Sequence, residues 1–250
     1  MPTHIEFRDV SVFYHRHKAL DELTFSVDRH SVFAVVGPAN SGKTTMLKCI
    51  NRTIEFNDGS HFTGDVMVDG ENVKSLRDVY ALRRRIGMVF PLPVGLPMSI
   101  YDNVAYAPRR MGVTGKSELD AIVERCLRDS VLWDEVKDRL NLLGTRLSGG
   151  QQQRLTLARA LSLDPEILCL DEFSIAIDPV TTMKIEEVLT RLKNKMTIIL
   201  VTNLTQQARR MADHVMFLNG SQLVEWGETE KMFNRPEKEI TGRYLNGDFG

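Results

Sequence analysis

The chain has 250 residues, of which 42% are hydrophobic and 26% are charged, close to the usage of an average globular domain. Its 32 lysines and arginines nearly balance its 33 aspartates and glutamates, so the formal net charge is −1. This balance argues against a dedicated nucleic-acid binder, whose field is normally strongly basic, and against an acidic disordered tail.

Three further classes of protein are disfavoured by composition. The longest apolar runs, such as Val32–Val36, fall far short of the roughly 18–20 residues that a bilayer-crossing helix needs. The three cysteines, Cys49, Cys126 and Cys169, lie far apart in apolar patterns and are interpreted as reduced core residues of a cytosolic protein. The histidines lack the spacing to cysteines or carboxylates that is typical of a zinc site, and none is expected.

The first part of the chain is predicted to be rich in strands. The strands expected here are 4–14, 22–28, 31–36, 65–69 and 85–90. The first two alternate apolar and polar residues, as half-buried strands do, whereas 31–36 is a continuous run typical of a buried parallel strand. A helix is expected to begin near Gly42, and residues 57–60 form a predicted turn.

From Pro91 the pattern changes, because three prolines within residues 91–97 predict an extended connector. The elements expected afterwards are helices at 99–107, 118–140, 150–162, 179–194 and 205–212, and strands at 166–170, 196–202 and 214–218. We therefore expect one α/β domain over residues 1–250. Residues 1–90 and 149–250 would form its core, and residues 91–148 would form a helical insert.

The segment Gly37–Thr44 fits the phosphate-loop pattern G-x-x-x-x-G-K-[ST] between a predicted strand and a predicted helix. Glycines let the backbone approach a phosphate, and the loop amides with the helix N-terminus favour an anion. Lys43 is expected to reach the β- and γ-phosphates, and Thr44 to offer its hydroxyl to Mg²⁺. The flanking elements disfavour the alternative, a plain glycine-rich turn. The nucleotide-binding residues predicted here are Gly37, Pro38, Ala39, Asn40, Ser41, Gly42, Lys43, Thr44 and Thr45.

A second motif is the apolar strand that ends in Asp171 and Glu172. Open α/β sheets bind ligands at the C-terminal ends of their strands, where these two carboxylates would lie. Asp171 is expected to hold Mg²⁺, directly or through water, and Glu172 to polarise the attacking water. Capping of the next helix is the alternative, which the phosphate loop upstream disfavours.

The third motif reads Leu-Ser-Gly-Gly-Gln-Gln-Gln-Arg over Leu147–Arg154. Ser148 and the two glycines precede a predicted helix, so a second helix N-terminus with a hydroxyl and bare amides is available to an anion. An ordinary helix N-cap is the alternative.

In this order and spacing, the three motifs resemble the nucleotide-binding subunit of ABC transporters over essentially the whole chain. The resemblance implies an α/β P-loop NTPase (RecA-like) core with an N-terminal antiparallel β-subdomain and an inserted α-helical subdomain. It also implies a head-to-tail dimer that sandwiches two ATP molecules. Tyr14 falls where the family stacks an aromatic ring on adenine, and Asp178 matches the loop that contacts the partner protomer. The residues that would serve the ATP of the opposite subunit are Ser148, Gly149, Gly150 and Gln151.

Within the family, residues 97–104 and the segment from 223 to the terminal Asp248, Phe249 and Gly250 look like bacterial phosphate-import ATPases. That resemblance implies a peripheral subunit at the cytoplasmic face of the membrane, using ATP and Mg²⁺. It would drive two transmembrane permease subunits together with a second ATP-binding subunit, either a copy or a homologue. A solute-binding protein would deliver the phosphate, and no nucleic-acid partner is expected.

Two positions depart from the family pattern. Pro91 stands where the family has a glutamine that ligates Mg²⁺, and proline has neither a polar side chain nor an N–H. Asn203 stands where the family has a histidine on the γ-phosphate, and it can donate a hydrogen bond but cannot titrate. Losing one preorganised donor costs about 2.7–4 kcal/mol in the transition state. With Glu172, Lys43 and Asn203 as the candidate catalytic residues, we expect retained MgATP affinity and slowed hydrolysis. Milder departures are Phe173 for a proline and Ile175 for a serine.

Two other functions stay open. The first is a regulatory or degenerate ABC subunit that binds ATP, dimerises with an intact homologue and has little turnover of its own. The second is a non-transport ABC ATPase acting on DNA or ribosomes, which would normally show long heptads, tandem cassettes or a basic field. The short basic runs at 83–85 and 109–110 are interpreted mainly as solvated faces, and contact with phosphate or with the permease is the alternative.

Overall fold

The computed structural model describes residues 2–248, so two residues of the C-terminal resemblance, Phe249 and Gly250, lie outside the described residues. Within this range the strands form one ten-stranded sheet in the order β5-β4-β1-β2-β10-β9-β3-β8-β7-β6. The strands are β1 (Thr3–Tyr14), β2 (His17–Asp28), β3 (Val32–Val36), β4 (Ser60–Val68), β5 (Glu71–Asn72), β6 (Ile86–Val89), β7 (Ile167–Asp171), β8 (Thr197–Val201), β9 (His214–Asn219) and β10 (Gln222–Glu228).

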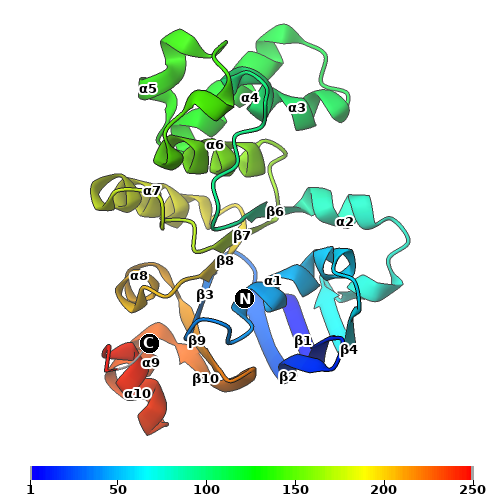
Figure 1. Cartoon of the computed structure of the whole chain (residues 1–250), viewed down its shortest axis with the longest axis vertical. Coiled ribbons are helices and arrows are strands. Elements are labelled where there is room, and N and C mark those ends of the chain that lie inside the picture. Colours follow the sequence, from blue (N-terminus) through cyan, green and yellow to red (C-terminus); the bar gives the residue numbers. More distant parts are fainter. Residues whose placement is uncertain (1, 249–250) are drawn as a thin grey trace.

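Helices cover the sheet and gather at both ends of the long axis (Figure 1). The α-helices are α1 (Lys43–Ile50), α2 (Val79–Arg85), α3 (Ile100–Arg110), α4 (Lys116–Asp129), α5 (Trp133–Val136), α6 (Gly149–Leu161), α7 (Pro179–Leu192), α8 (Thr205–Met211), α9 (Thr229–Asn234) and α10 (Glu239–Leu245). Short 3₁₀ turns are η1 (Thr53–Phe56), η2 (Val73–Ser75), η3 (Lys137–Arg139) and η4 (Gly144–Arg146). Helices α3 to α6 lie at one end, and α9 and α10 at the other. Among the described residues, no helix combines the length and the apolar character needed to span a bilayer.

The parallel strands β6, β7, β8, β3 and β9 are apolar because both of their faces are buried. Alternate residues of β3 face two different cores, since side chains alternate along a strand. Ala34 belongs to the core that also contains residues of α3, α4, α6, α7 and α8, whereas Phe33 belongs to the core that contains residues of α1 and the antiparallel strands. This sandwich holds the C-terminal ends of β3 and β7 rigidly beside the start of α1.

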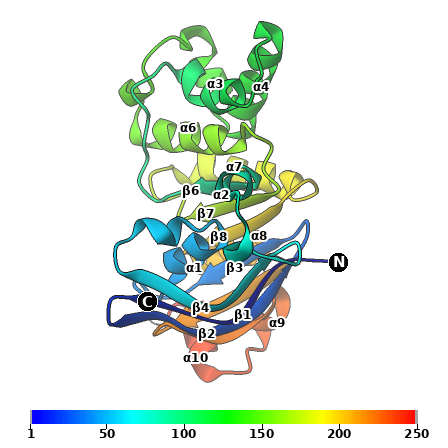
Figure 2. The ribbon, with the colours of Figure 1, turned by 90° about the vertical axis from the view of Figure 1, so that its right-hand side faces the viewer.

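The antiparallel strands β1, β2, β4 and β5 form the part of the sheet that lies against α1 (Figure 2). Three stacked phenylalanines join this layer to the parallel strands, with ring centroids 4.6 Å apart for Phe7 and Phe25 and 5.4 Å apart for Phe25 and Phe33. The predicted α/β class is confirmed, and the expected cysteine burial is also observed, with Cys49, Cys126 and Cys169 all unpaired.

The single helix predicted over 118–140 is wrong. Helix α4 ends at Asp129, and the chain then turns through Val131, whose φ of 56° is left-handed. The amide of Leu132 donates to Leu127 O at 2.8 Å, the long-range bond of a Schellman helix ending. Full burial of Leu132 stabilises this turn, so tertiary packing breaks a pattern that looks continuous in sequence. The elements β5, α2, β10, α9 and α10 were not predicted.

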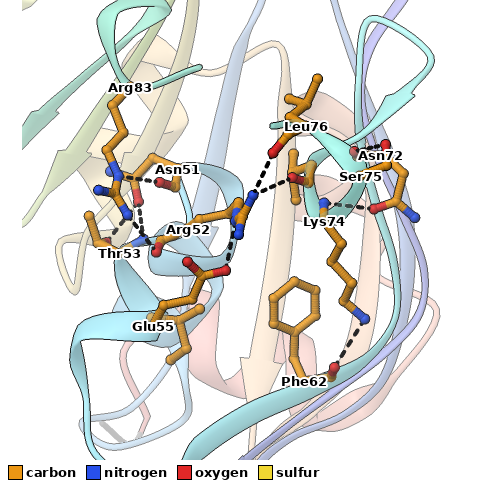
Figure 3. Close-up of polar contacts among 12 residues, drawn as sticks. Asn51, Arg52, Thr53, Glu55, Phe62, Asn72, Lys74, Ser75, Leu76 and Arg83 are labelled. Carbon is orange, nitrogen blue, oxygen red and sulfur yellow. Dashed lines mark hydrogen bonds and ion pairs between the residues drawn. The ribbon is translucent and has the colours of Figure 1, made fainter. Parts of the chain in front are cut away.

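The reading of residues 83–85 as a solvated face is wrong for two of the three arginines. Arg83 donates from Nε to Asn51 O at 3.1 Å and from Nη2 to Arg52 O at 3.0 Å (Figure 3). These carbonyls end α1, where a cation is favoured by the helix dipole. Arg85 instead binds both carboxylate oxygens of Glu166 at 2.9 Å. Both guanidinium groups therefore tie α2 and its neighbours to the core.

His4, in β1, is the buried member of a charged cluster that also contains Asp69, Arg85 and Glu166. Its ring, with 1% exposure, bonds through Nδ1 to Thr197 Oγ1 at 2.7 Å. Its Nε2 lies 3.6 Å from Asp69 Oδ1 and 3.9 Å from Glu166 Oε2. These ligand atoms lie within 4.8 Å of one another, a grouping that could hold a metal ion. Arg85 binds both carboxylates, so we assign the cluster a structural role.

We expect His4 to make stability acid-sensitive. Burial lowers the pKa of His4 to about 4, against the partial opposition of Asp69. Above pH 6.5, His4 is neutral in both the folded and the unfolded chain, and the free energy of unfolding is not reduced. As pH drops from 6.5 towards 4, the unfolded chain binds a proton at His4 that the folded chain does not, so the free energy of unfolding falls. The expected loss is about 3 kcal/mol, measured as the free energy of unfolding in urea at pH 7 and pH 4. A His4→Gln variant should lose about 3 kcal/mol less, and an unchanged pH dependence in this variant contradicts the assignment.

Candidate functional site

A cavity of about 480 Å³ opens where the C-terminal ends of β3 and β7 meet the start of α1. Such an edge of parallel strands is where open α/β sheets bind ligands. Its lining residues are Tyr14, His17, Ala19, Ala39, Asn40, Gly42, Lys43, Thr44, Thr45, Pro91, Asp171 and Glu172. The structure thus brings together three groups that lie far apart in the sequence. They are the predicted phosphate loop, the Asp-Glu pair and the predicted adenine contact.

The phosphate loop requires both of its fixed glycines. A Cβ at Gly37 would lie 1.9 Å from Leu218 O, and one at Gly42 would lie 2.6 Å from Ala19 O. Gly42 also has a φ of 102°, which disfavours any side chain. Asn40 adopts a left-handed φ of 62°, a conformation that asparagine tolerates better than most residues. Both glycines are therefore needed for the shape of the loop beside the cavity.

Lys43 is the buried cation of this loop, with 5% of its surface exposed. Its Nζ donates to Gly37 O and to Pro38 O, both at 2.7 Å. Burial lowers the pKa of this ammonium group, and the nearby Glu172 and Asp171 oppose that shift. The loop carbonyls thus hold a positive charge inside the curve where an anion would sit.

Thr44 and Asp171 form an oxygen pair beside the lysine. Thr44 Oγ1 donates to Asp171 Oδ2 at 2.7 Å, and Asp171 is 1% exposed. Burial raises the pKa of this carboxyl group, with the Thr44 hydrogen bond opposing the shift. A divalent cation would favour the ionised carboxylate. Hydroxyl and carboxylate oxygens are ligands that Mg²⁺ prefers, so the donor set fits this ion.

Glu172 is held in a strained backbone conformation directly after β7. Its φ is 45°, left-handed for a residue with a side chain, and its amide donates to Val201 O at 2.8 Å. Such strain costs about 1–3 kcal/mol and concentrates at functional sites. Asn203 Nδ2 donates to Glu172 Oε1 at 2.7 Å. The asparagine that replaces the family histidine therefore holds one oxygen of the candidate base.

Pro91 lines the cavity, and the residues around it are fastened to α6. Gln153 Nε2 donates to Phe90 O at 2.8 Å, and Gly95 N donates to Gln152 Oε1 at 3.1 Å. Pro91 itself offers no donor to the cavity. Hydrogen bonds from α6 therefore fix the connector on both sides of the proline.

The remaining wall of the cavity comes from the turn between β1 and β2. Tyr14 is half-buried, and its hydroxyl lies 3.3 Å from Thr45 Oγ1. His17, paired with Tyr14 across the turn, also lines the cavity and was missed in the sequence. The pattern that predicts His17 is the two-residue turn between Tyr14 and His17, which places the two residues opposite each other in a β-hairpin.

The third motif lies elsewhere. Ser148 caps α6, since its Oγ accepts from Gln151 N at 3.4 Å and its amide donates to Gln151 Oε1 at 3.1 Å. Asp178 caps α7 through Thr181 N at 2.9 Å, and this backbone bond lowers the pKa of Asp178. Among residues 2–248, the cavity is lined neither by the residues predicted to serve a partner's ATP nor by Asp178, which was predicted to contact the partner protomer; the former are Ser148, Gly149, Gly150 and Gln151. The alternative interpretation of Ser148 as a helix N-cap is confirmed. The N-terminus of α6, with Ser148 and the two glycines, does not line the cavity that contains the chain's own phosphate loop.

Comparisons with known proteins agree with this geometry. Residues 20–174 match the family described as ABC transporter. A bacterial Atm1-family ABC exporter with ATP bound is 25% identical over 98% of this chain, with a TM-score of 0.84, although this chain spans only 42% of the exporter chain. The ATP-binding cassette MJ0796, in a dimeric post-hydrolysis state bound to ADP and Pi, is 26% identical over 90% of this chain and 98% of its own, with a TM-score of 0.78.

A third structure supports the fold alone. CbiO1 from Clostridium perfringens, part of the ABC transporter complex cbiONQ, is 22% identical over 95% of this chain and 93% of its own, with a TM-score of 0.81. The three structures confirm the predicted phosphate-loop α/β fold.

Proposed function

Because this chain belongs to the ABC transporter family and carries its ATP-binding domain, we propose that it is the ATP-binding subunit of an importer that takes up inorganic phosphate. It would bind MgATP at the cavity and hydrolyse it slowly. The observation that supports this most strongly is the convergence of Lys43, Thr44, Asp171 and Glu172 on one cavity. A lysine, an oxygen pair that suits a metal ion and a second carboxylate are the groups that phosphoryl transfer uses.

Each group then has a role. The amides of the loop 37–42 and the Lys43 ammonium bind the β- and γ-phosphates, and Tyr14 packs on the adenine. Thr44 and Asp171 would hold Mg²⁺, which when bound would neutralise charge on the phosphates. Glu172 accepts a hydrogen bond from the attacking water and orients it, while Asn203 fixes the other side of the Glu172 carboxylate.

Slow turnover follows from the two departures. Pro91 supplies no donor or ligand at the cavity wall, and Asn203 is shorter than a histidine and donates one of its two Nδ2 hydrogens to Glu172 at 2.7 Å. One preorganised donor to the γ-phosphate is therefore missing in the transition state. The ground-state contacts of Lys43, Thr44 and Asp171 are unaffected, so affinity persists.

The site would be completed by a second ATP-binding subunit, a copy or a homologue, in head-to-tail arrangement. Two observations support this arrangement. Ser148 and the N-terminus of α6 lie outside the chain's own cavity, and the MJ0796 structure is a dimer. Gly150 is closely packed at this N-terminus, since a Cβ there would lie 2.8 Å from Ala176 O. Asp178, in the same loop as Ala176, would then face the partner. A subdomain division at 91–148, with 1–90 and 149–250 as the core, is part of this proposal.

The importer type, the phosphate cargo and the membrane partners rest on the resemblance of residues 97–104 and of the C-terminal segment from 223. Two transmembrane permease subunits would bind this chain at the cytoplasmic face, and a solute-binding protein would deliver phosphate. A second candidate is a degenerate or regulatory subunit with little turnover of its own. The observation that favours it is the pair Pro91 and Asn203 at the cavity.

The variant Lys43→Met tests nucleotide binding. We expect MgATP affinity to fall by roughly 10–100-fold, because charge-assisted hydrogen bonds contribute about 1.5–3 kcal/mol. Calorimetric titration measures the affinity, and Lys184→Met, an exposed lysine on α7, is the matched control. Equal affinity of Lys43→Met and wild type contradicts the proposed site.

The same variant tests the importer assignment. Cells that depend on this chain should lose uptake of labelled phosphate when they carry Lys43→Met but keep it with Lys184→Met. Full phosphate uptake in cells carrying Lys43→Met, together with the expected fall in MgATP affinity in vitro, excludes the phosphate-import role without affecting the ATPase assignment.

A further inference from the structure

A buried amide connects the two segments that carry Glu172 and Asn203. Gln207, on α8, is 1% exposed, and its Nε2 donates to Ser174 Oγ at 3.3 Å and to Glu186 Oε1 at 3.1 Å. Ser174 lies two residues after Glu172, and Gln207 lies four residues after Asn203. One side chain therefore bridges the loop after β7, the helix α7 and the helix α8.

The acceptor on α7 is itself fixed. The Glu186 side chain is only 8% exposed, and Arg210 of α8 binds it in a bidentate pair, at 2.9 Å from Nε and 2.8 Å from Nη2. Arg210 neutralises the carboxylate without Gln207, so removal of the amide leaves no unpaired buried charge. The pair holds α7 against α8, and Gln207 adds the connection to Ser174.

The Gln207 amide is placed at a cost to stability. Its two Nε2 hydrogens are both used, but its Oε1 is buried without a hydrogen-bond partner among residues 2–248. A buried acceptor left unpaired carries the full penalty of its desolvation. An apolar side chain of similar length would avoid that penalty, so the two donated hydrogen bonds point to a role other than packing.

We infer that Gln207 is a positioning residue for hydrolysis, an inference that rests on the proposed ATPase function. By tying Ser174 to α8, it holds the segment that begins with Glu172 beside the segment that begins with Asn203. The backbone continues the tie, since Gln207 N donates to Leu204 O at 2.9 Å and Leu204 N donates to Thr202 Oγ1 at 3.0 Å. The 2.7 Å hydrogen bond between Asn203 and Glu172 then depends on the relative position of these two segments.

The test is Gln207→Met, with Gln206→Met at the exposed neighbouring position as the control. We expect the kcat for MgATP hydrolysis to fall about 10-fold in Gln207→Met, because small displacements of a catalytic group are costly. KM for MgATP should stay within about 2-fold, since the phosphate loop is untouched, and the unfolding midpoint should not fall. A change in KM that accounts for the loss, or an unchanged kcat, overturns the inference.

A second background separates positioning from a general structural effect. In Asn203→Ala protein, where the relative position of the two segments no longer sets a hydrogen bond to Glu172, Gln207→Met should change kcat by less than about 2-fold. An equal 10-fold fall in both backgrounds overturns the inference. Ser174→Ala removes only one contact of Gln207 and should give part of the fall, so it carries the test if Gln207→Met does not fold.

A readout without turnover keeps the two claims distinguishable. In nucleotide-free protein, amide hydrogen exchange over residues 172–178 should be faster in Gln207→Met than in Gln206→Met. If wild type hydrolyses no ATP, the proposed function fails. The exchange measurement still decides whether Gln207 holds the loop after β7 in place. Unchanged exchange over residues 172–178 overturns the role of Gln207 whatever the activity.

Discussion

Glu172→Gln is expected to lower the kcat for ATP hydrolysis by a factor on the order of 10²–10⁴, the usual contribution of a general base. The glutamine keeps the size of the side chain, and its amide oxygen still accepts from Asn203 Nδ2, which lies 2.7 Å from Glu172 Oε1 in wild type. The change therefore removes the basic carboxylate while the position is kept. MgATP affinity should change little, because the residues that we propose to contact the phosphates and Mg²⁺ are unaltered; they are Lys43, Thr44 and Asp171.

Release of inorganic phosphate at saturating MgATP measures this loss, with calorimetric affinity from the same preparation. Glu187→Gln, an exposed glutamate of α7, makes the same chemical change away from the cavity and should leave kcat unchanged. Full turnover in Glu172→Gln would remove Glu172 from the mechanism and place the base elsewhere.

The double variant Pro91→Gln with Asn203→His is expected to raise kcat by about 10²–10³-fold, the value of one preorganised donor to the transition state. Glutamine restores a polar side chain at the cavity wall, and histidine adds a donor that reaches further than the asparagine amide. Affinity for MgATP should stay within about 3-fold, because the ground-state contacts are unchanged. Steady-state phosphate release and calorimetric titration of both proteins measure the two effects.

The single variants assign the gain to one position or the other. Gln153 binds the backbone carbonyl of Phe90, so the attachment of the connector to α6 does not depend on the side chain at position 91. Pro91→Gln therefore tests the missing cavity group with that attachment kept. A double variant no faster than wild type would show that the two departures do not set the rate.

The sequence was most informative where burial is uniform. The strands β3, β7 and β8 are buried at every residue, and their apolar runs predicted them to within one or two residues. The helices α2, α9 and α10 are short, and such helices are stable mainly through tertiary packing that leaves a weak periodic signal. The break at Val131 was hidden for the same reason, since the burial of Leu132 decides it.

For the site, spacing predicted the groups that converge on the cavity, because a phosphate loop and an Asp-Glu strand end are local patterns. The amides of Gln153 and Gln207 were not found as contacts, because their partners are far apart in the chain or are backbone carbonyls. The hydrogen bond from Asn203 to Glu172 was not predicted either, because it too joins residues far apart in the chain. The resemblance predicts a histidine at position 203, and the structure shows which carboxylate oxygen Asn203 binds in its place.

The most direct test is the release of phosphate from MgATP by the purified chain, compared with Lys43→Met protein prepared in the same way. The proposed function predicts slow, saturable hydrolysis that requires Mg²⁺ in wild type and none above background in the variant. A wild-type rate no greater than that of Lys43→Met, with MgATP bound equally by both, would contradict an ATPase site at this cavity.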